Sequence, residues 1–196
     1  ENQFEMLRKL QLTTAQTREL KDHCDARGII FLTTPFDEWS LEQLDDFDLP
    51  AYKVASTDLT NLPLLKKIAA RNKPIFLSTG MSYLSEVKLA LREILPINEQ
   101  VVVMQCTADY PLNDAEVNLN VIDTYKSEFG CLVGFSDHSM GIGAGPLAVA
   151  MGAKVVEKHF TLDKSLQGPD HLASLSPEEL KEFVTSIRKV ETYLGS

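Results

Sequence analysis

Short apolar segments recur along the chain, and each one ends in small polar or charged residues. Stretches with helical apolar spacing lie between them, so that a strand-and-helix unit repeats roughly every 25 residues, the spacing of a (β/α)8 barrel. The apolar runs are continuous rather than alternating, which favours parallel strands covered on both faces. The six predicted strands are residues 29–32, 51–56, 74–77, 101–104, 131–135 and 153–160.

Capping residues mark several helix ends. Thr13 and Gln16 have the spacing of a capping box, and Gly28 lies where the helix that they begin should stop. The run Ser40-Leu41-Glu42-Gln43 has the same spacing and predicts the start of a short helix. Ser176 followed by Pro177 predicts the start of the last helix.

Six units are two fewer than a closed barrel needs. We therefore expect an α/β fold, a TIM (β/α)8 barrel represented only by its strands 3 to 8. Residues 1–196 would form a partial catalytic barrel domain, with two N-terminal βα units absent, because an open arc leaves two unpaired strand edges. A flavodoxin-like open sheet is the alternative, although it would not place polar residues at every strand end.

Composition restricts the class of function. The chain is 44% hydrophobic and 24% charged, which is typical of a globular protein. A formal net charge of -9 without a basic stripe argues against a nucleic-acid partner, but a local pocket can still bind an anionic small molecule. No apolar run is long enough to span a membrane. Three cysteines without metal-ligand spacing indicate thiols in a reducing compartment, so we expect a cytoplasmic protein.

Two of the four histidines close predicted neighbouring strands. His138 follows the fifth strand and His159 lies at the end of the sixth, where barrels and doubly wound sheets bind their ligands. Neutral imidazoles at these positions can hold one divalent metal such as Mn²⁺. Spacing alone leaves open the alternative that both are hydrogen-bonded structural histidines. Asp137 and Glu157 are candidate partners of the pair, although Glu157 is also compatible with a position facing the helix layer.

Hydroxyls and one ammonium recur at the other strand ends. Lys53, Ser56, Ser78 and Ser136 could converge on a phosphate, and it is the recurrence on three strands that favours this interpretation over ordinary strand-end serines. Asp58 follows Ser56 by two residues and is a candidate general acid/base. The alternative for Asp58 is a turn residue.

Two further patterns have weaker signals. Tyr110, Asp170 and His171 lie in loops after the fourth and sixth predicted strands and could contact a polar substrate, or they are simply solvated. Residues 141–146 mimic a dinucleotide-binding fingerprint, but Pro146 replaces its third glycine. Close packing of a helix against the sheet by small residues explains these glycines better.

Seven stretches, in order, resemble the sialic acid synthase family, which comprises the bacterial N-acetylneuraminate synthases and their legionaminate and pseudaminate relatives. They are FLTTPFD (31–37), YKVASTDLTNLPLL (52–65), KPIFLSTGM (73–81), QCTADYP (105–111), GFSDHSMG (134–141), AKVVEKHFTLDK (153–164) and GPDHLASLSPEEL (168–180). The resemblance implies a TIM barrel that condenses phosphoenolpyruvate with an open-chain N-acetylated amino sugar, typically N-acetylmannosamine. The products would be a nine-carbon 2-keto sugar acid and phosphate.

The resemblance also implies roles for individual residues. His138 and His159 would bind the divalent metal, Mn²⁺ or Mg²⁺, and Asp58 occupies the place of the family's acidic residue. Phosphoenolpyruvate would be bound by Lys53, Ser56, Ser78 and Ser136, and the amino sugar by Tyr110 and Asp170. Ala108 departs from the pattern, because some members have Asn at this position.

Several family features are expected but missing. The chain lacks the Ala-Glu, Asn-His and Lys-Phe-Gln motifs of the first two strands. It also lacks the C-terminal antifreeze-like domain, which lends an Arg to the site of the partner subunit in a homo-oligomer. We therefore expect residues 1–196 alone to be inactive or nearly so. Two other functions stay open: a metal-dependent aldolase that uses pyruvate, and an inactive barrel fragment whose edges pair with another copy.

Overall fold

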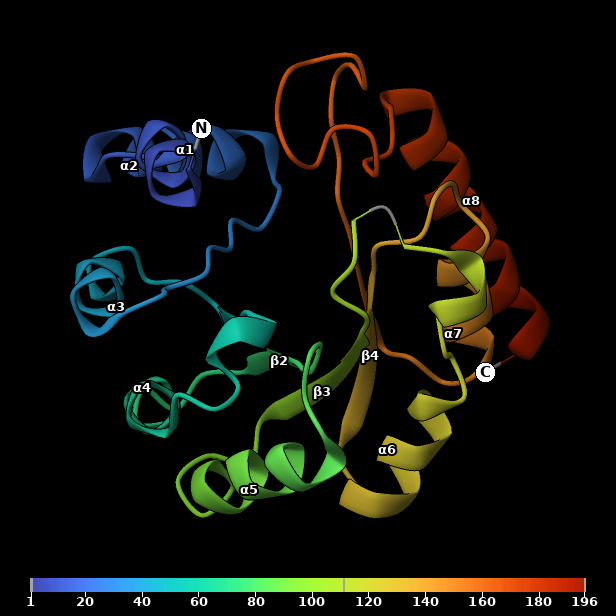
Figure 1. Ribbon diagram of the computed structural model, residues 1–196, viewed down its shortest axis with the longest axis horizontal. Coiled ribbons are helices and arrows are strands. Elements are labelled where there is room, and N and C mark those ends of the chain that lie inside the picture. The colour runs from blue at the N-terminus through green and yellow to red at the C-terminus, as the bar shows by residue number, and fades with distance from the viewer. Residues whose placement is uncertain (1, 111, 196) are drawn as a thin grey trace.

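The computed structural model describes residues 2–110 and 112–195, which form a half-barrel around one sheet of five parallel strands. Figure 1 shows the strands at the centre and the helices in an arc around them. The strands are β1 (Tyr52–Val54), β2 (Ile75–Ser78), β3 (Val101–Cys106), β4 (Leu132–Asp137) and β5 (Val155–Lys158). The helices are α1 (Gln3–Leu10), α2 (Thr14–Arg27), α3 (Glu38–Asp45), α4 (Leu62–Ala69), α5 (Leu84–Ile94), α6 (Val121–Phe129), α7 (Ala144–Ala150) and α8 (Pro177–Leu194), with short turns η1 (Ser56–Asp58) and η2 (Asp114–Glu116).

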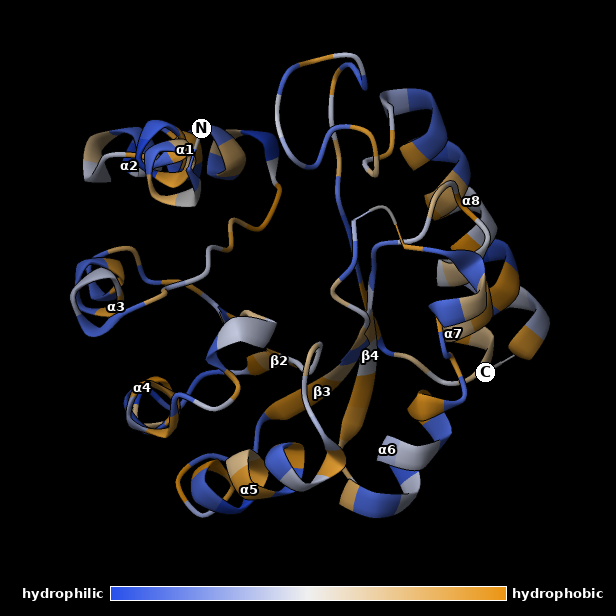
Figure 2. Cartoon of the chain, viewed as in Figure 1, coloured by the Kyte–Doolittle hydropathy of each residue, from blue (hydrophilic) through white to orange (hydrophobic). Residues whose placement is uncertain are grey.

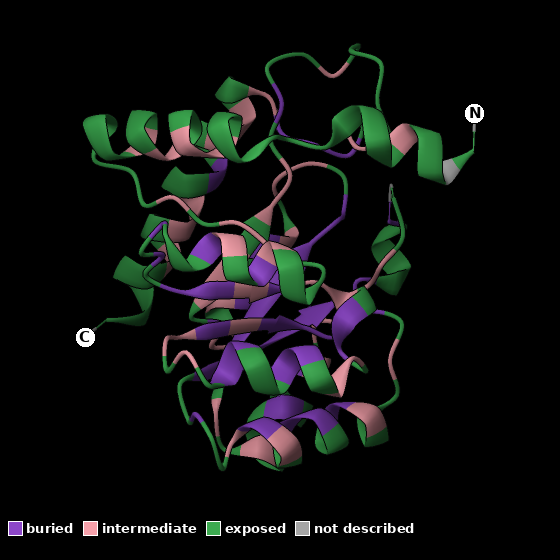
Figure 3. Cartoon of the chain, turned by 90° about the vertical axis from the view of Figure 1, so that its left-hand side faces the viewer, coloured by how far each residue is buried: buried purple, intermediate pink, exposed green. Residues whose placement is uncertain are grey.

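The strand order follows the chain, β1-β2-β3-β4-β5, without a reversal. A doubly wound sheet reverses its strand order at the point where it binds ligand, so the sequential order favours the barrel over the flavodoxin-like alternative. All six residues of β3 are buried, as are the inward faces of α4 and α5. Figure 2 shows that β3 is apolar, and Figure 3 shows the buried residues gathered in the sheet and on the helix faces toward it. The prediction of parallel strands covered on both faces is thus confirmed for the middle of the sheet.

The predicted first strand, residues 29–32, is wrong. This segment has no strand pairing in the structure, and Ile29 and Ile30 are 63% and 72% exposed. A strand exists only through its hydrogen-bonded ladder, and an apolar sequence without a neighbour stays an extended connection. The described chain therefore has five strands rather than the six βα units that were predicted.

Most predicted helix ends are confirmed. Thr13 and Gln16 form the expected capping box of α2, and Gly28 ends that helix with a φ of 70°, a conformation that favours glycine. The start predicted at Ser40 is wrong, because α3 begins earlier with Asp37 as its cap. The Asp37 carboxylate accepts from the Ser40 amide at 2.6 Å, so Ser40 lies inside the first turn.

One of the three glycines in residues 141–146, Gly145, serves packing. A Cβ on Gly145 would lie 2.3 Å from Cζ of Phe183, so the glycine lets α7 and α8 come close. The packing explanation is confirmed at this position, but the partner is a helix rather than the sheet. Among the helices within the described residues, none is long and apolar enough to cross a membrane.

Candidate active site

The candidate residues gather where the five parallel strands end. Strands that run in one direction bring their carboxyl ends to one rim of a barrel, which is where barrel enzymes bind substrate. Lys53 lies within β1, Ser78 ends β2, Ser136 lies near the end of β4, and His159 directly follows β5. Ser56 begins the turn η1 after β1.

Lys53 contacts two other strands across the interior, and a third through Glu157. Its ammonium donates to Ser78 Oγ at 2.8 Å and lies 3.7 Å from Glu157 Oε2. Glu157 in turn accepts from Ser136 Oγ at 2.7 Å. Burial lowers the pKa of Lys53, and the negative charge of Glu157 opposes that shift. The result is a poorly solvated cation with the Ser78 hydroxyl at hydrogen-bond distance, which can bind an anion.

Ser56 joins this group through the loop after β2. Its Oγ accepts from the amide of Gly80 at 2.9 Å and lies 3.5 Å from Cys106 Sγ. A Cβ on Gly80 would approach Ser56 Oγ to 2.9 Å, so a glycine is needed for this contact. The predicted cradle residues Lys53, Ser56, Ser78 and Ser136 are thus neighbours in space, as their strand-end positions predicted.

His138 is buried, and each of its two ring nitrogens has a hydrogen-bond partner. Its Nδ1 lies 2.8 Å from the carbonyl oxygen of Thr107, which can only accept, so Nδ1 carries the proton. Its Nε2 then has a free lone pair and accepts from the hydroxyl of Tyr110 at 3.0 Å. Burial lowers the pKa of His138 and favours the neutral ring. A metal-binding imidazole likewise donates from one nitrogen to a carbonyl, and Nε2 of His138 can bind a metal once the Tyr110 hydroxyl leaves it.

His159 and Tyr110 complete an aromatic group around His138. The rings of His138 and His159 are 5.3 Å apart between centroids, and Tyr110 contacts both rings at 4.1 and 5.4 Å. Burial raises the pKa of Tyr110 to about 12, with contributions from Cys106 and from the charge of Asp170. Asp170 therefore acts on the same group from the loop after β5. Pro111, which belongs to the matching stretch 105–111, lies outside the described residues.

A divalent metal fits the two imidazoles but would need further ligands. In residues 2–110 and 112–195, no group of three or more His, Cys, Asp or Glu side chains surrounds one point. The neutral His138 fits a metal through Nε2 when the Tyr110 hydroxyl gives up that lone pair, and the His159 ring lies 5.3 Å away. Water or substrate would have to occupy the remaining positions.

Two predicted residues are not joined to this group. Asp58 is buried in η1, where it accepts from Asn61 Nδ2 at 3.3 Å and from Thr57 Oγ1 at 3.4 Å. Within the described chain, no hydrogen bond or ion pair links Asp58 to the lysine or the histidines. His171 makes a contact within its own loop, with Nδ1 at 2.8 Å from Thr161 Oγ1.

Glu157 is a site residue whose orientation does not follow from its polarity alone. It faces the interior, toward Ser136 and Lys53, rather than the helix layer. The signal was available, because Glu157 precedes His159 by two residues and alternate residues of a strand share a face. Asp137, the other candidate partner of the histidines, lies on the opposite face of the sheet and pairs with Lys158 at 3.1 Å.

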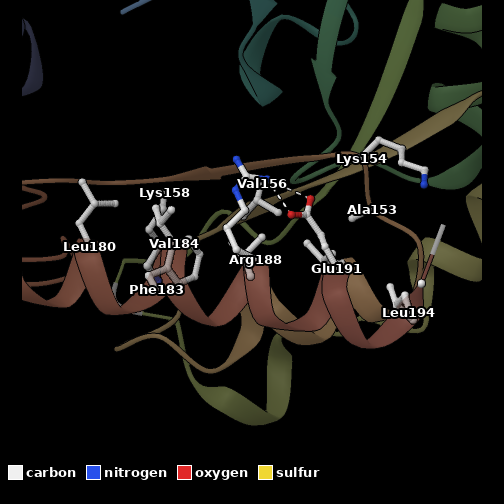
Figure 4. A pocket seen from close by; sticks show the side chains of 13 residues that line it. Ala153, Lys154, Val156, Lys158, Leu180, Phe183, Val184, Arg188, Glu191 and Leu194 are labelled. Carbon is white, nitrogen blue, oxygen red and sulfur yellow. Dashed lines mark hydrogen bonds and ion pairs between the residues drawn. The ribbon is translucent and has the colours of Figure 1, made fainter.

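Two cavities lie away from this rim. One of about 530 Å³ lies between β5 and α8, as Figure 4 shows, and is lined by Val156, Lys158 and Phe183 among others. Because Val156 and Lys158 point into it, Glu157 and His159 point to the other side of β5. A second cavity of about 800 Å³ lies near α1, α2 and α3 and is lined by Thr33, Phe36 and Trp39 among others. Neither cavity contains a candidate catalytic residue.

Comparison with known proteins gives a match to the NeuB family over residues 1–196. The N,N'-diacetyllegionaminic acid synthase of Legionella pneumophila is 44% identical over 199 residues, which cover 99% of this chain and 56% of that protein. The chain thus spans little more than half the length of the curated relatives that it matches.

Solved structures of similar proteins have the same fold. The N-acetylneuraminic acid (sialic acid) synthetase of Leptospira borgpetersenii serovar Hardjo-bovis, in complex with citrate, matches with a TM-score of 0.94 and 33% identity, over 98% of this chain and 67% of that one. A truncated 3-deoxy-D-arabino-heptulosonate 7-phosphate synthase from Thermotoga maritima matches with a TM-score of 0.83 and 21% identity, over 94% of this chain and 74% of that one. The second likeness concerns the fold alone.

Proposed function

Because the chain belongs to the NeuB family, as its motifs predicted, we propose that the protein condenses phosphoenolpyruvate with an N-acetylated amino-sugar aldehyde. The aldehyde would be similar to N-acetylmannosamine, and the products a nine-carbon 2-keto sugar acid and phosphate. Relatives named as legionaminic and sialic acid synthases support sugar acid synthesis in general. The observation that carries the proposal is the poorly solvated Lys53, 2.8 Å from Ser78 Oγ and on the same rim as the paired histidines.

Lys53 and the hydroxyls of Ser56, Ser78 and Ser136 would hold the anionic groups of phosphoenolpyruvate. A buried ammonium next to hydroxyl donors forms strong charge-assisted hydrogen bonds with phosphate or carboxylate oxygens. The lowered pKa of Lys53 reflects its loss of solvent, and a bound anion would compensate for that loss. Holding both substrates on one rim brings carbon 3 of phosphoenolpyruvate toward the sugar aldehyde.

His138 and His159 would hold a divalent cation, Mn²⁺ or Mg²⁺. Such a cation would act as a Lewis acid toward the sugar aldehyde. Tyr110 and Asp170, which lie on the same side, would contact the amino sugar. Asp58 would serve as general acid/base for the water that adds at carbon 2.

The open edges of β1 and β5 motivate a further part of this proposal. Each of these strands is paired on one side only within the described residues. We propose that a closed barrel of eight strands needs three more strands to pair these edges, and that residues 1–196 alone turn over little or no substrate. We further propose that the whole protein is a cytoplasmic homo-oligomer, with a C-terminal antifreeze-like domain that contributes to the partner subunit's site.

The test is phosphate release by the full-length protein. Release should require phosphoenolpyruvate, the amino-sugar aldehyde and Mn²⁺ together. His138→Ala and His159→Ala should lower the rate by more than the roughly 10- to 100-fold that loss of an outer partner of a metal ligand costs. His23→Ala is the control, because His23 lies exposed on α2.

The outcome also separates the alternative reactions. A folded full-length protein that releases no phosphate would contradict the proposal. Carbon–carbon bond formation from pyruvate, without phosphate release, would establish the aldolase instead.

A further inference from the structure

A buried charge pair lies directly beside the two histidines. The side chains of Asp137 and Lys158 are 0% and 3% exposed, and Lys158 Nζ lies 3.1 Å from Asp137 Oδ2. That oxygen has no hydrogen-bond partner of its own among the described residues. Each member of the pair is the sequence neighbour of one histidine, because Asp137 precedes His138 and Lys158 precedes His159.

The pair lies in register across the last two strands. Asp137 of β4 is aligned with Lys158 of β5, one step after the aligned pair of Ser136 and Glu157. Side chains alternate between the faces of a sheet. The contact between Ser136 and Glu157 therefore ties the strands together on the interior face, at 2.7 Å, and the charge pair ties them on the face toward α8. Figure 4 shows Lys158 on this second face.

Both members of the pair also form hydrogen bonds with the backbone of the residue after His138. Asp137 Oδ1 accepts from the amide of Ser139 at 2.9 Å and from its hydroxyl at 2.6 Å. Lys158 donates to the carbonyl oxygen of Ser139. The residue before His138 is thus a member of the charge pair and the residue after it is bonded to both members, while Lys158 ends the strand that His159 directly follows.

We propose that Asp137 and Lys158 are positioning residues that set the height and direction of His138 relative to His159. Strand β5 is paired on one side only, so its end depends on contacts with β4 for its position. Buried ion pairs add little net stability over apolar residues, but they specify one arrangement in several known systems. The inference rests on the proposed function, in which the two imidazoles share a cation.

The experiment compares Asp137→Asn, Lys158→Met and the double variant in the full-length protein. The double variant leaves no unpaired buried charge, so it tests positioning even where a single variant folds poorly. Mn²⁺ affinity, measured by calorimetry, should fall by about 10- to 100-fold in each variant, the effect of losing an outer partner of a metal ligand. Asp45→Asn is the matched control, because Asp45 pairs with Arg71 at 2.7 Å between α3 and the end of α4, and it should leave the affinity within about twofold.

A readout without metal separates this inference from the metal site itself. In the metal-free protein, the ring nitrogen and carbon resonances of both His138 and His159 should shift in the Asp137 and Lys158 variants and stay unchanged in Asp45→Asn. A charge pair that only stabilises the fold would lower the melting temperature and leave the ring resonances and the Mn²⁺ affinity of the folded protein unchanged, and this result would overturn the proposal. A wild-type protein that binds no Mn²⁺ would refute the proposed metal site, and the ring resonances would still decide the positioning role.

Discussion

The two edge strands of the sheet, β1 and β5, are packed very differently. Each has one hydrogen-bonded neighbour in the described chain, β2 and β4 respectively. Tyr52 and Val54 of β1 are nevertheless only 2% and 1% exposed, whereas the two valines of β5, Val155 and Val156, are only partly buried. The position of a strand in the ladder therefore does not decide its burial, which depends on the side chains that cover it.

The cover of β1 comes from the α3 region. Leu41, Phe47 and Leu49 belong to the same buried cluster as Tyr52, and the Tyr52 hydroxyl donates to Asp45 at 3.4 Å. The face of β5 toward α8 instead borders a cavity of about 530 Å³. The candidate site spans both edges, because Lys53 comes from β1 and His159 follows β5. One side of the site is thus held by a packed core and the other by a few polar contacts.

The largest expected difference concerns aromatic residues near the two edges. Tyr52→Ala should destabilise the protein by about 3–5 kcal/mol, because it removes a fully packed ring. Phe160→Ala, directly beyond β5, should change stability by about 0.5 kcal/mol or less, since Phe160 is 50% exposed. Urea denaturation measures both. Equal losses would contradict the contrast between the two edges.

A smaller effect is expected where β5 contacts the rest of the sheet. A Cβ on Gly134 of β4 would lie 2.9 Å from the carbonyl oxygen of Val155 and 3.0 Å from Met104 Cγ. Gly134→Ala should cost about 1–3 kcal/mol, because a backbone group has to move. Amide hydrogen exchange should rise in β5 and stay unchanged in β1. Gly143→Ala is the control, because no atom lies within 4 Å of its added Cβ, and faster exchange in β1 than in β5 would refute the weaker hold on β5.

Two valines offer the same chemical change at both edges. Val54→Ala should cost about 2 kcal/mol, since it removes buried methyl groups and leaves a cavity. Val156→Ala should cost less than about 1 kcal/mol, because Val156 is only partly buried and already borders a cavity. The difference between the two variants, in guanidinium denaturation, measures the packing contrast directly. A larger loss for Val156→Ala would reverse it.

The same contrast explains what the sequence could predict. The apolar runs of β2, β3 and β4 could be predicted as strands because both faces are largely covered, and the strand-end positions of Ser78, Ser136 and His138 followed from them. The run at residues 29–32 has the same composition, yet Ile30 stays 72% exposed because no neighbouring strand pairs with it. Strand pairing is a property of two segments, and an apolar composition in one of them does not reveal the other.

Contacts on the two faces of β5 were harder to predict. Alternation along the strand places Glu157 on the same face as His159, but a polar side chain is equally compatible with a position facing the helix layer. The contacts of Glu157 with Lys53 and Ser136 show that it faces the interior. The burial of Lys158 against Asp137 was not foreseen at all, because a charged residue at a strand end is usually solvated. Cross-strand partners depend on register, which a single sequence does not state.

The smallest effect concerns the ion pair that covers the β1 side. The hydrogen bond from Arg71 is the main cause that lowers the pKa of Asp45 in the folded protein. The pair therefore stabilises the fold above the unfolded pKa of about 4, and this contribution is lost as the pH falls through the lower folded pKa.

Asp45→Asn should cost less than about 1 kcal/mol at pH 7, because solvent screens the pair, and the difference from wild type should shrink below pH 4. Glu191→Gln removes the pair with Arg188 within α8, on the β5 side, and should cost about 0.3 kcal/mol. A loss in Asp45→Asn that stays constant down to low pH, in urea denaturation, would show that the side chain stabilises β1 through packing rather than charge.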